Sequence, residues 1–263
     1  MLRVIGGLPR SGSTLFAALL NEHTNLNVTP TGFLPQLLRG MGSGFNLSDT
    51  RAAWKDADDA RRRYERAVLG AVDGYLGPMG VEKSRDASWL SGVWAQAAGE
   101  QPRIILMVRD LREIAASMER KYQTRPEMIG GSMQARLIDM FKETSAPLGA
   151  ALSGMLDGIH DGRLKNYRVV RFEDFVQQPE IIVTEAVRYL GGEVLTPPVQ
   201  TSGDDREHDA IHSPVGDHRV YAGSVTPPKK RWPEVIGKEL ADGIVRGNEP
   251  FYRSFYPEVL NGG

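Results

Sequence analysis

The amino-acid sequence predicts an α/β fold in which a central parallel β-sheet carries helices on both faces. Apolar segments of strand length alternate with segments of helical periodicity, which is the order that a parallel sheet with crossover helices requires. The near-continuous apolar run over 103–108 is typical of a parallel strand buried on both faces. Near the N-terminus, a short apolar strand leads through a glycine-rich loop into a helix. We expect a single domain over 1–263.

The same two periodicities predict the remaining elements. The stretch 29–44 contains so many Gly and Pro residues that it predicts a loop, either a wall or lid of an acceptor site or a plain surface connection. We expect strands at 2–5, 25–28, 81–84, 103–108 and 167–172. We expect a first helix from the glycine-rich loop to His23 and a second from a cap at Asp49 or Thr50 to about Tyr75. Further helices are expected at 87–98, after 110, at 133–144, 147–159 and 179–190, and from Pro233.

Composition limits the classes of function. The chain has 41% hydrophobic residues, 25% charged residues and a net charge of −1, so nothing favours nucleic acid or an anionic membrane as a partner. The absence of cysteine excludes disulfides, thiolate zinc sites and cysteine nucleophiles. The loop begins at Gly7 and no run of about 18 apolar residues occurs, so we expect no signal peptide, no membrane span and a cytoplasmic location.

The N-terminal loop has the spacing of a phosphate-binding loop, Gly-x4-Gly-x-Thr, which runs from Gly7 to Thr14. Backbone N–H groups in such a loop, together with the positive end of the following helix, attract an anion. Ser13 stands where a nucleotide triphosphatase carries Lys, and Arg10 supplies a cation from inside the loop. The sequence therefore predicts a P-loop nucleotide-binding fold and an anionic nucleotide other than ATP.

Residues 9–14, Pro-Arg-Ser-Gly-Ser-Thr, resemble the 5′-phosphosulfate loop of sulfotransferases that use 3′-phosphoadenosine 5′-phosphosulfate (PAPS). A second stretch, 108–118, resembles the part of that family that binds the 3′-phosphate, with an Arg at a strand end and a Ser eight residues later. The alternative for this stretch is an ion pair between Arg109 and Asp110, with Ser117 merely exposed. The resemblance implies that the donor is bound by Arg10, Ser11, Gly12, Ser13, Thr14, Arg109 and Ser117.

Lys83 ends a predicted core strand and resembles the family lysine that contacts the transferring sulfuryl group. A fixed cation there stabilises the charge that develops on the sulfuryl oxygens in the transition state. The alternative is a surface Lys before a helix cap. The stretch 171–180 also resembles the family, with Phe172 where several relatives have Tyr. Lys83 and Arg10 are therefore the candidates for stabilising the transferring group.

The pattern is nearest the branch that includes tyrosylprotein sulfotransferases, but 28–32 lacks the catalytic Glu of that branch. The general base consequently stays open, and the irregular segment 193–230 supplies the candidates. The Arg-Lys-Gly loop of cytosolic sulfotransferases is also absent, and residues of the same segment are candidates to close over the nucleotide. The candidate bases are His212, with His208, His218, Asp204 and Asp205, and the candidate closing residues are Ser213, Tyr221, Ser224 and 229–231.

The resemblance implies an enzyme that moves a sulfuryl group from PAPS to an acceptor hydroxyl or amine by in-line displacement, without a metal, and releases adenosine 3′,5′-bisphosphate. The acceptor is a small molecule or a peptide, and the oligomeric state stays open. Two alternatives also stay open: a P-loop kinase or nucleotide hydrolase that uses ATP and magnesium, and a non-catalytic nucleotide-binding module. Ser13 argues against the first, whereas the missing Glu motivates the second.

Overall fold

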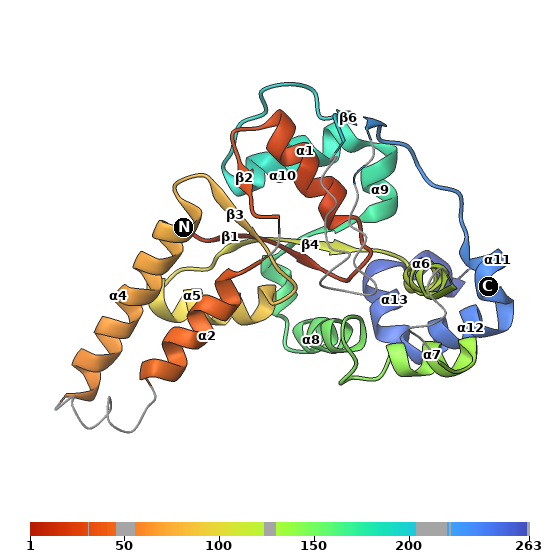
Figure 1. Cartoon of the computed structure of the whole chain (residues 1–263), viewed down its shortest axis with the longest axis horizontal. Helices are drawn as coiled ribbons and strands as arrows, with labels where there is room; N and C mark the ends of the chain where they lie inside the picture. Colours follow the sequence, from red (N-terminus) through yellow and green to blue (C-terminus); the bar gives the residue numbers. More distant parts are fainter. Residues whose placement is uncertain (31, 46–55, 124–129, 204–219, 221, 262–263) are drawn as a thin grey trace.

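The computed structural model in Figure 1 describes residues 1–30, 32–45, 56–123, 130–203, 220 and 222–261. Within these residues a sheet of five parallel strands lies at the centre of the molecule. The predicted α/β fold with a central parallel sheet is therefore confirmed. Across the sheet the strands are, in order, β2 (Asn27–Val28), β3 (Gly80–Lys83), β1 (Arg3–Gly7), β4 (Arg103–Val108) and β5 (Arg168–Arg171).

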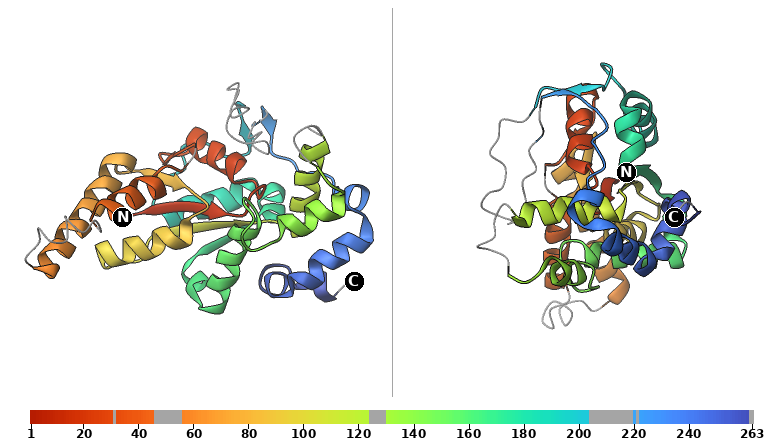
Figure 2. Two further views of the ribbon diagram at one scale, coloured as in Figure 1. Left: turned by 60° about the horizontal axis from the view of Figure 1, so that its bottom comes forward. Right: turned by 90° about the vertical axis from the view of Figure 1, so that its right-hand side faces the viewer.

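Helices cover both faces of the sheet, as Figures 1 and 2 show. One face carries α1 (Ser13–His23), α9 (Phe172–Gln177) and α10 (Pro179–Leu190). The opposite face carries two groups of helices, which lie near opposite ends of the molecule (Figure 2). These groups are α2 (Leu34–Phe45), α4 (Ala57–Leu76) and α5 (Ala87–Ala98), and α6 (Leu111–Gln123), α7 (Met133–Met140), α8 (Gly149–His160), α12 (Gly237–Gly247) and α13 (Glu249–Phe255).

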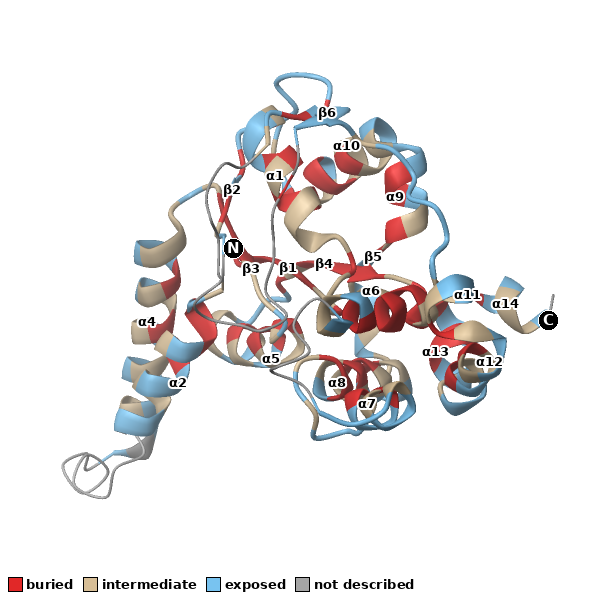
Figure 3. Cartoon of the chain, turned by 45° about the vertical axis from the view of Figure 1, so that its right-hand side comes forward, coloured by how far each residue is buried: buried red, intermediate tan, exposed pale blue. Residues whose placement is uncertain are grey.

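The strand β4 shows why helices pack on both faces. Its side chains alternate, so Ile105 and Met107 join the core under α1 and α10, whereas Ile104 and Leu106 join the cores on the other face. All four side chains are buried, and Figure 3 shows the central strands enclosed by helices whose outer faces are exposed. The apolar run at 103–108 therefore forms the doubly buried strand that the sequence predicts.

The prediction of a loop over 29–44 is wrong for most of that stretch, because α2 occupies Leu34–Phe45. Leu34 and Leu38 are fully buried against α4 and α5, and Pro35 lies in the first turn, where its missing N–H is tolerated. The packing of this apolar face outweighs the low helix propensity of the glycines.

The helix predicted to begin at Asp49 or Thr50 starts later, at Ala57 of α4. Its cap is Asp56, whose side chain accepts a hydrogen bond from the backbone N–H of Asp58. Asp49 and Thr50 lie outside the described residues.

Further differences concern the ends of elements in the second half of the chain. The helix expected over 133–144 already ends at Met140, and α8 begins at Gly149, two residues after Pro147. The strand predicted to reach Phe172 ends at Arg171, because Phe172 begins α9. The chain also forms η2 (Arg163–Asn166), the strand pair β6 (Gln200–Thr201) and β7 (Gly223–Ser224), and the short helices α11 (Trp232–Val235) and α14 (Pro257–Asn261).

The aromatic C-terminal segment packs on the body of the protein. Phe251, Tyr252 and Tyr256 are buried in the core formed with α6 and α8. The Tyr252 hydroxyl donates to Asp110 Oδ1 at 2.9 Å, directly beyond the end of β4. The C-terminal helices are therefore fastened to the edge of the sheet where the parallel strands end. None of the described helices has the length and apolar character needed to cross a membrane.

Candidate functional site

The loop between β1 and α1 lies at the carboxyl edge of the sheet. Arg10 and Gly12 have positive φ angles of 62° and 84°, which turn the backbone tightly into the helix. The buried Ser11 hydroxyl forms a hydrogen bond within the loop, because it donates to Leu8 O at 2.6 Å. The helix has no side-chain cap at Gly12 and no acidic residue in its first turn. Its first N–H groups and its dipole therefore favour an anion.

Two glycines allow this loop to lie close to its neighbours. A Cβ on Gly7 would stand 2.1 Å from Met107 O, so the end of β1 lies against β4. A Cβ on Gly12 would stand 2.4 Å from the Phe172 ring, so the loop also packs on the start of α9. Both positions have positive φ as well, which makes glycine the residue that fits the space and the backbone angle together.

Arg109 projects from the end of β4 towards this loop. Its NH1 group donates to Arg10 O at 3.0 Å, and its guanidinium lies 4.3 Å from the centre of the Phe172 ring. Glu113, one turn into α6, approaches it at 3.7 Å. Burial lowers the pKa of Arg109, while the charges of Glu113 and Glu173 oppose that shift. Among the described residues no group accepts a hydrogen bond from the buried Nε of Arg109.

Arg10 and Ser117 lie next to one another, although 107 positions separate them in the sequence. Arg10 Nε donates to Ser117 Oγ at 3.1 Å, so the cation of the loop reaches α6. The alternative pairing of Arg109 with Asp110 is not formed, because Asp110 accepts hydrogen bonds from Arg112 and Tyr252 instead. The structure therefore brings together the two stretches, 9–14 and 108–118, that resemble the donor-binding parts of sulfotransferases.

Lys83 lies at the other side of the loop. Its Nζ donates to Thr14 Oγ1 at 3.1 Å and to Pro30 O at 3.0 Å. The parallel register places Lys83 beside Ile5 of β1, so β3 ends where the loop begins. The ammonium group consequently faces the start of α1, on the side of the loop away from Arg109.

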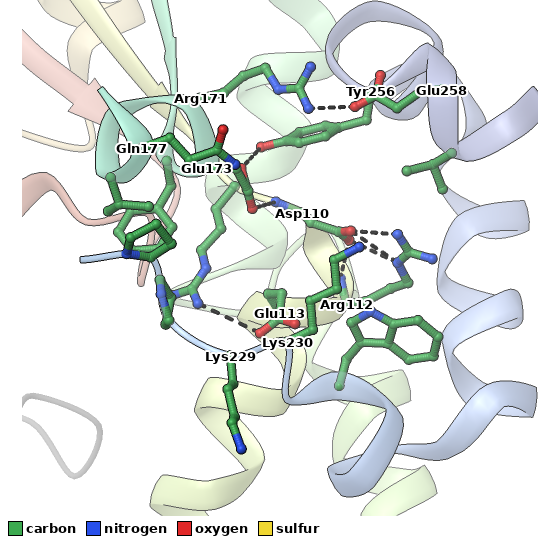
Figure 4. Close-up of a pocket in the computed structure, with 17 residues that line it drawn as sticks. Asp110, Arg112, Glu113, Arg171, Glu173, Gln177, Lys229, Lys230, Tyr256 and Glu258 are labelled. Atoms are coloured by element: carbon green, nitrogen blue, oxygen red, sulfur yellow. Dashed lines mark hydrogen bonds and ion pairs between the residues drawn. The ribbon is translucent and has the colours of Figure 1, made fainter. Parts of the chain in front are cut away.

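A cavity of about 220 Å³ adjoins Arg109, and Figure 4 shows the residues that line it. Phe172, Glu113, Lys229 and Lys230 are among its lining residues. The segment that carries both lysines is fixed to α6, because the Arg231 backbone N–H donates to Glu113 Oε1 at 2.9 Å. Part of the predicted closing segment 229–231 therefore lines this cavity.

The carboxylates of the site were not predicted from the sequence. Glu113 follows Arg109 at the i+4 spacing of a helix, which was an available signal, since such pairs lie on one face. Glu173 accepts hydrogen bonds from the Asp110 N–H at 3.2 Å and from the Tyr256 hydroxyl at 2.7 Å. It thereby connects the residue after Arg109 to the C-terminal segment. No local sequence pattern predicts this contact.

The remaining candidates belong to the predicted irregular segment 193–230. His212, His208, His218, Asp204, Asp205, Ser213 and Tyr221 lie outside the described residues. Ser224 is exposed in β7. Within the described ranges, no group of three or more His, Asp or Glu side chains is arranged to hold a metal ion.

Similarity to known proteins is limited to solved structures. No family model matches the chain, and no curated protein matches it. Three similar structures are all sulfotransferases or sulfotransferase domains. One is a sulfotransferase from Alicyclobacillus acidocaldarius, with 18% identity over 73% of this chain and 81% of the other and a TM-score of 0.47. The domain from the Synechococcus PCC 7002 olefin synthase has 20% identity over 72% of each chain and a TM-score of 0.41. The domain from the curacin biosynthetic pathway has 18% identity over 92% and 89% and a TM-score of 0.49.

Proposed function

We propose that this chain is a sulfotransferase that moves the sulfuryl group of PAPS to an acceptor hydroxyl or amine. The observation that carries the proposal is the convergence of two basic sites on one loop. Lys83 and the uncapped start of α1 form the first site, and Arg109 with Ser117 forms the second. Arg10 belongs to the first by sequence and contacts the second through Ser117. A nucleotide with anionic groups at two separate positions fits this arrangement.

In this proposal the 5′-phosphosulfate lies in the loop and the 3′-phosphate lies at Arg109. The N–H groups of Gly12, Ser13 and Thr14 at the helix start receive the first anion. The 3′-phosphate, as the second anion, gives the buried Nε of Arg109 a hydrogen-bond acceptor, and the Ser117 hydroxyl adds a neutral hydrogen-bond donor. Lys229 and Lys230 line the cavity beside Arg109, although the Lys229 side chain points away from it in Figure 4. Ser11 shapes the loop through its bond to Leu8.

The reaction is an in-line displacement at sulfur. The acceptor oxygen or nitrogen forms a bond to sulfur, the bond from sulfur to the 5′-phosphate oxygen breaks, and adenosine 3′,5′-bisphosphate leaves. Lys83 and Arg10 stabilise the negative charge on the sulfuryl oxygens and on the leaving oxygen. The acceptor loses its proton to a base, for which His212 remains our candidate. Because of the resemblance to the tyrosylprotein branch, we propose a peptide tyrosine as well as small molecules as candidate acceptors. The scheme uses no metal.

The alternative, a kinase or nucleotide hydrolase that uses ATP and magnesium, is less well supported. Such an enzyme needs a Lys at position 13, where this chain has Ser, and usually an acidic residue at a strand end to hold magnesium. Asp110 has that location, but its carboxylate accepts from Arg112 Nε at 3.0 Å and NH2 at 2.6 Å and from Tyr252. These bonds occupy the oxygens that a metal would need.

The test is calorimetric titration of the protein with adenosine 3′,5′-bisphosphate in the absence of metal, compared with ATP plus magnesium. We expect the bisphosphate to bind much more tightly, and Arg109→Ala to weaken it by about 1.5–3 kcal/mol, which is the scale of a hydrogen bond to a charged group. Arg61→Ala is the matched control, because Arg61 lies exposed on α4 in a surface ion pair with Glu65.

Two outcomes would contradict the proposal. Tight binding of ATP with magnesium and no response to the bisphosphate would favour the kinase. Tight bisphosphate binding with no sulfuryl transfer to a broad panel of phenols, alcohols, amines and tyrosine peptides would favour the non-catalytic module.

A further inference from the structure

Glu82 is a fully buried carboxylate on β3, directly before Lys83. Because side chains alternate along a strand, Glu82 points to the opposite face of the sheet from Lys83, towards the core under α2 and α4. A buried carboxylate requires hydrogen-bond donors to offset the loss of water. The groups that donate hydrogen bonds to Glu82 belong to the segment that follows β2.

Glu82 fastens both ends of the segment 29–34. Its Oε1 accepts from the backbone N–H of Leu34, the first residue of α2, at 3.0 Å. Its Oε2 accepts from the Thr29 hydroxyl at 3.1 Å. Thr29 Oγ1 in turn accepts from the backbone N–H of Lys83 at 2.9 Å. One carboxylate therefore holds the start of α2 and, through Thr29, the end of β3.

The middle of the segment also lies against the end of β3. A Cβ on Gly32 would stand 2.5 Å from Lys83 O and 2.7 Å from Glu82 Oε1. The segment therefore approaches the strand more closely than a side chain at this position would permit.

This segment supplies one of the acceptors that hold the Lys83 ammonium group. Lys83 Nζ donates to Pro30 O as well as to Thr14 Oγ1 in the phosphate-binding loop. Pro30 directly follows Thr29, so the position of its carbonyl depends on the bond from Thr29 to Glu82. The position of the ammonium group is thus coupled to a carboxylate on the other face of the sheet.

We propose that Glu82 is a positioning residue, which acts through Thr29 and Pro30 to hold Lys83 at the sulfuryl end of the donor. This inference rests on the proposed function, because it gives Lys83 a sulfuryl group to contact. It also supplies a reason for a buried acid beside this lysine: Glu82 orders the segment whose Pro30 carbonyl accepts a hydrogen bond from Lys83 Nζ.

The ionisation of Glu82 supports this role. Burial raises its pKa to about 7, although the hydrogen bonds from Leu34 and Thr29 act in the opposite direction. Among the described residues, Tyr75 of α4 interacts electrostatically with Glu82, and burial and the charge of Glu82 raise the pKa of Tyr75. The carboxylate form, which accepts both hydrogen bonds, therefore predominates above about pH 7 and is lost as the pH falls.

The test compares two ligands that differ only in the sulfuryl group. Calorimetry gives the affinities for PAPS and for adenosine 3′,5′-bisphosphate, and their ratio reports the contact that Lys83 makes. We expect Lys83→Ala, Glu82→Gln and Thr29→Val each to lower the preference for PAPS, which is the ratio of the two affinities, at least threefold. Thr29→Ser, which keeps the hydroxyl, restores the preference. Between pH 8 and pH 6 the preference of the wild type is expected to fall relative to that of Glu82→Gln. This comparison cancels the titration of the bisphosphate's own 5′-phosphate, whose second pKa is about 6.

Thr24→Val is the matched control for Thr29→Val. Thr24 is also a buried Thr beside β2, where its hydroxyl donates to Leu20 O and accepts from the Leu26 N–H, but it lies at the far end of α1. This variant is expected to leave the preference for PAPS unchanged. If Lys83→Ala lowers the preference and Glu82→Gln does not, the inference is overturned and the proposed function stands. If the wild type binds neither ligand, the proposed function fails and the inference fails with it.

Discussion

At the scale of single residues, the site depends on contacts that pair a special backbone conformation with a neighbouring side chain. Phe172 is the clearest example. Its ring lies against Gly12 of the loop and also contacts the Arg109 guanidinium. Such a cation–π contact contributes about 0.5–2 kcal/mol and fixes the orientation of the guanidinium. The ring therefore links the two basic sites without a polar group of its own.

Gly12→Ala is expected to weaken ligand binding while the protein still folds. Alanine at φ 84° costs about 1–2 kcal/mol, and its Cβ would also collide with the Phe172 ring. We therefore expect a loss of bisphosphate affinity of at least tenfold, measured by calorimetry, while thermal unfolding remains cooperative.

Gly99→Ala isolates the backbone cost, because Gly99 has a φ of 69° and no described atom lies within 4 Å of an added Cβ. That control should lower the stability and leave binding unchanged. Equal bisphosphate affinity of Gly12→Ala and the wild type would show that the contact with Phe172 does not shape the site.

At the scale of elements, α2 shows that tertiary packing can override local propensity. The glycines of this stretch predicted a loop, yet Leu34, Leu38 and α4 bury one side of a regular helix. Glycine in a helix interior costs about 0.5–1 kcal/mol relative to alanine. This helix is therefore less stable than its length suggests, and it depends on α4 and on its cap from Glu82.

Gly40→Ala is expected to stabilise the protein by about 0.5–1 kcal/mol, because Gly40 is exposed on α2 and no described atom lies within 4 Å of an added Cβ. Urea unfolding followed by circular dichroism measures the change. Gly74→Ala, at an equally open position in α4, is the reference, because the sequence already predicts a helix at this position. A lower stability of Gly40→Ala alone would contradict the assignment of α2 as a helix at this position.

At the scale of the whole molecule, the C-terminal helices complete the edge of the sheet at which the site lies. Tyr252 and Tyr256 donate to Asp110 and Glu173, which follow β4 and β5. Burial, and then these carboxylates, raises the pKa of both hydroxyls, so they stay protonated donors at all ordinary pH values. The ends of two core strands are thus held by residues from the last part of the chain.

Tyr252→Phe is expected to lower the free energy of unfolding by about 1.5–3 kcal/mol, because it removes a hydrogen bond to a buried carboxylate and adds no cavity. Chemical denaturation is the measurement. Tyr167→Phe is the comparison, since the buried hydroxyl of Tyr167 has no hydrogen-bond partner among the described residues, and a smaller loss is expected. Equal losses in the free energy of unfolding of the two variants would mean that the hydrogen bond from Tyr252 to Asp110 does not stabilise the fold.

Features that depend on neighbouring residues could be predicted from the sequence. The apolar run of β4, the glycine spacing of the loop and the helical stripes after it all follow from local periodicity and local backbone freedom. Those patterns predicted the parallel sheet and indicated Arg10 as the cation of the loop. The resemblance to sulfotransferases singled out Lys83, Arg109 and Ser117, and the structure places all four residues around one loop.

Contacts between distant segments required the folded molecule. Glu113 and Glu173 beside Arg109, the Phe172 ring on Gly12, and the position of Glu82 behind Lys83 depend on which elements pack together. The same is true of α2, whose residues become a helix because α4 and α5 cover them. Burial and hydrogen bonding across long sequence distances have no periodic signal along the chain, so only the packing of the elements specifies them.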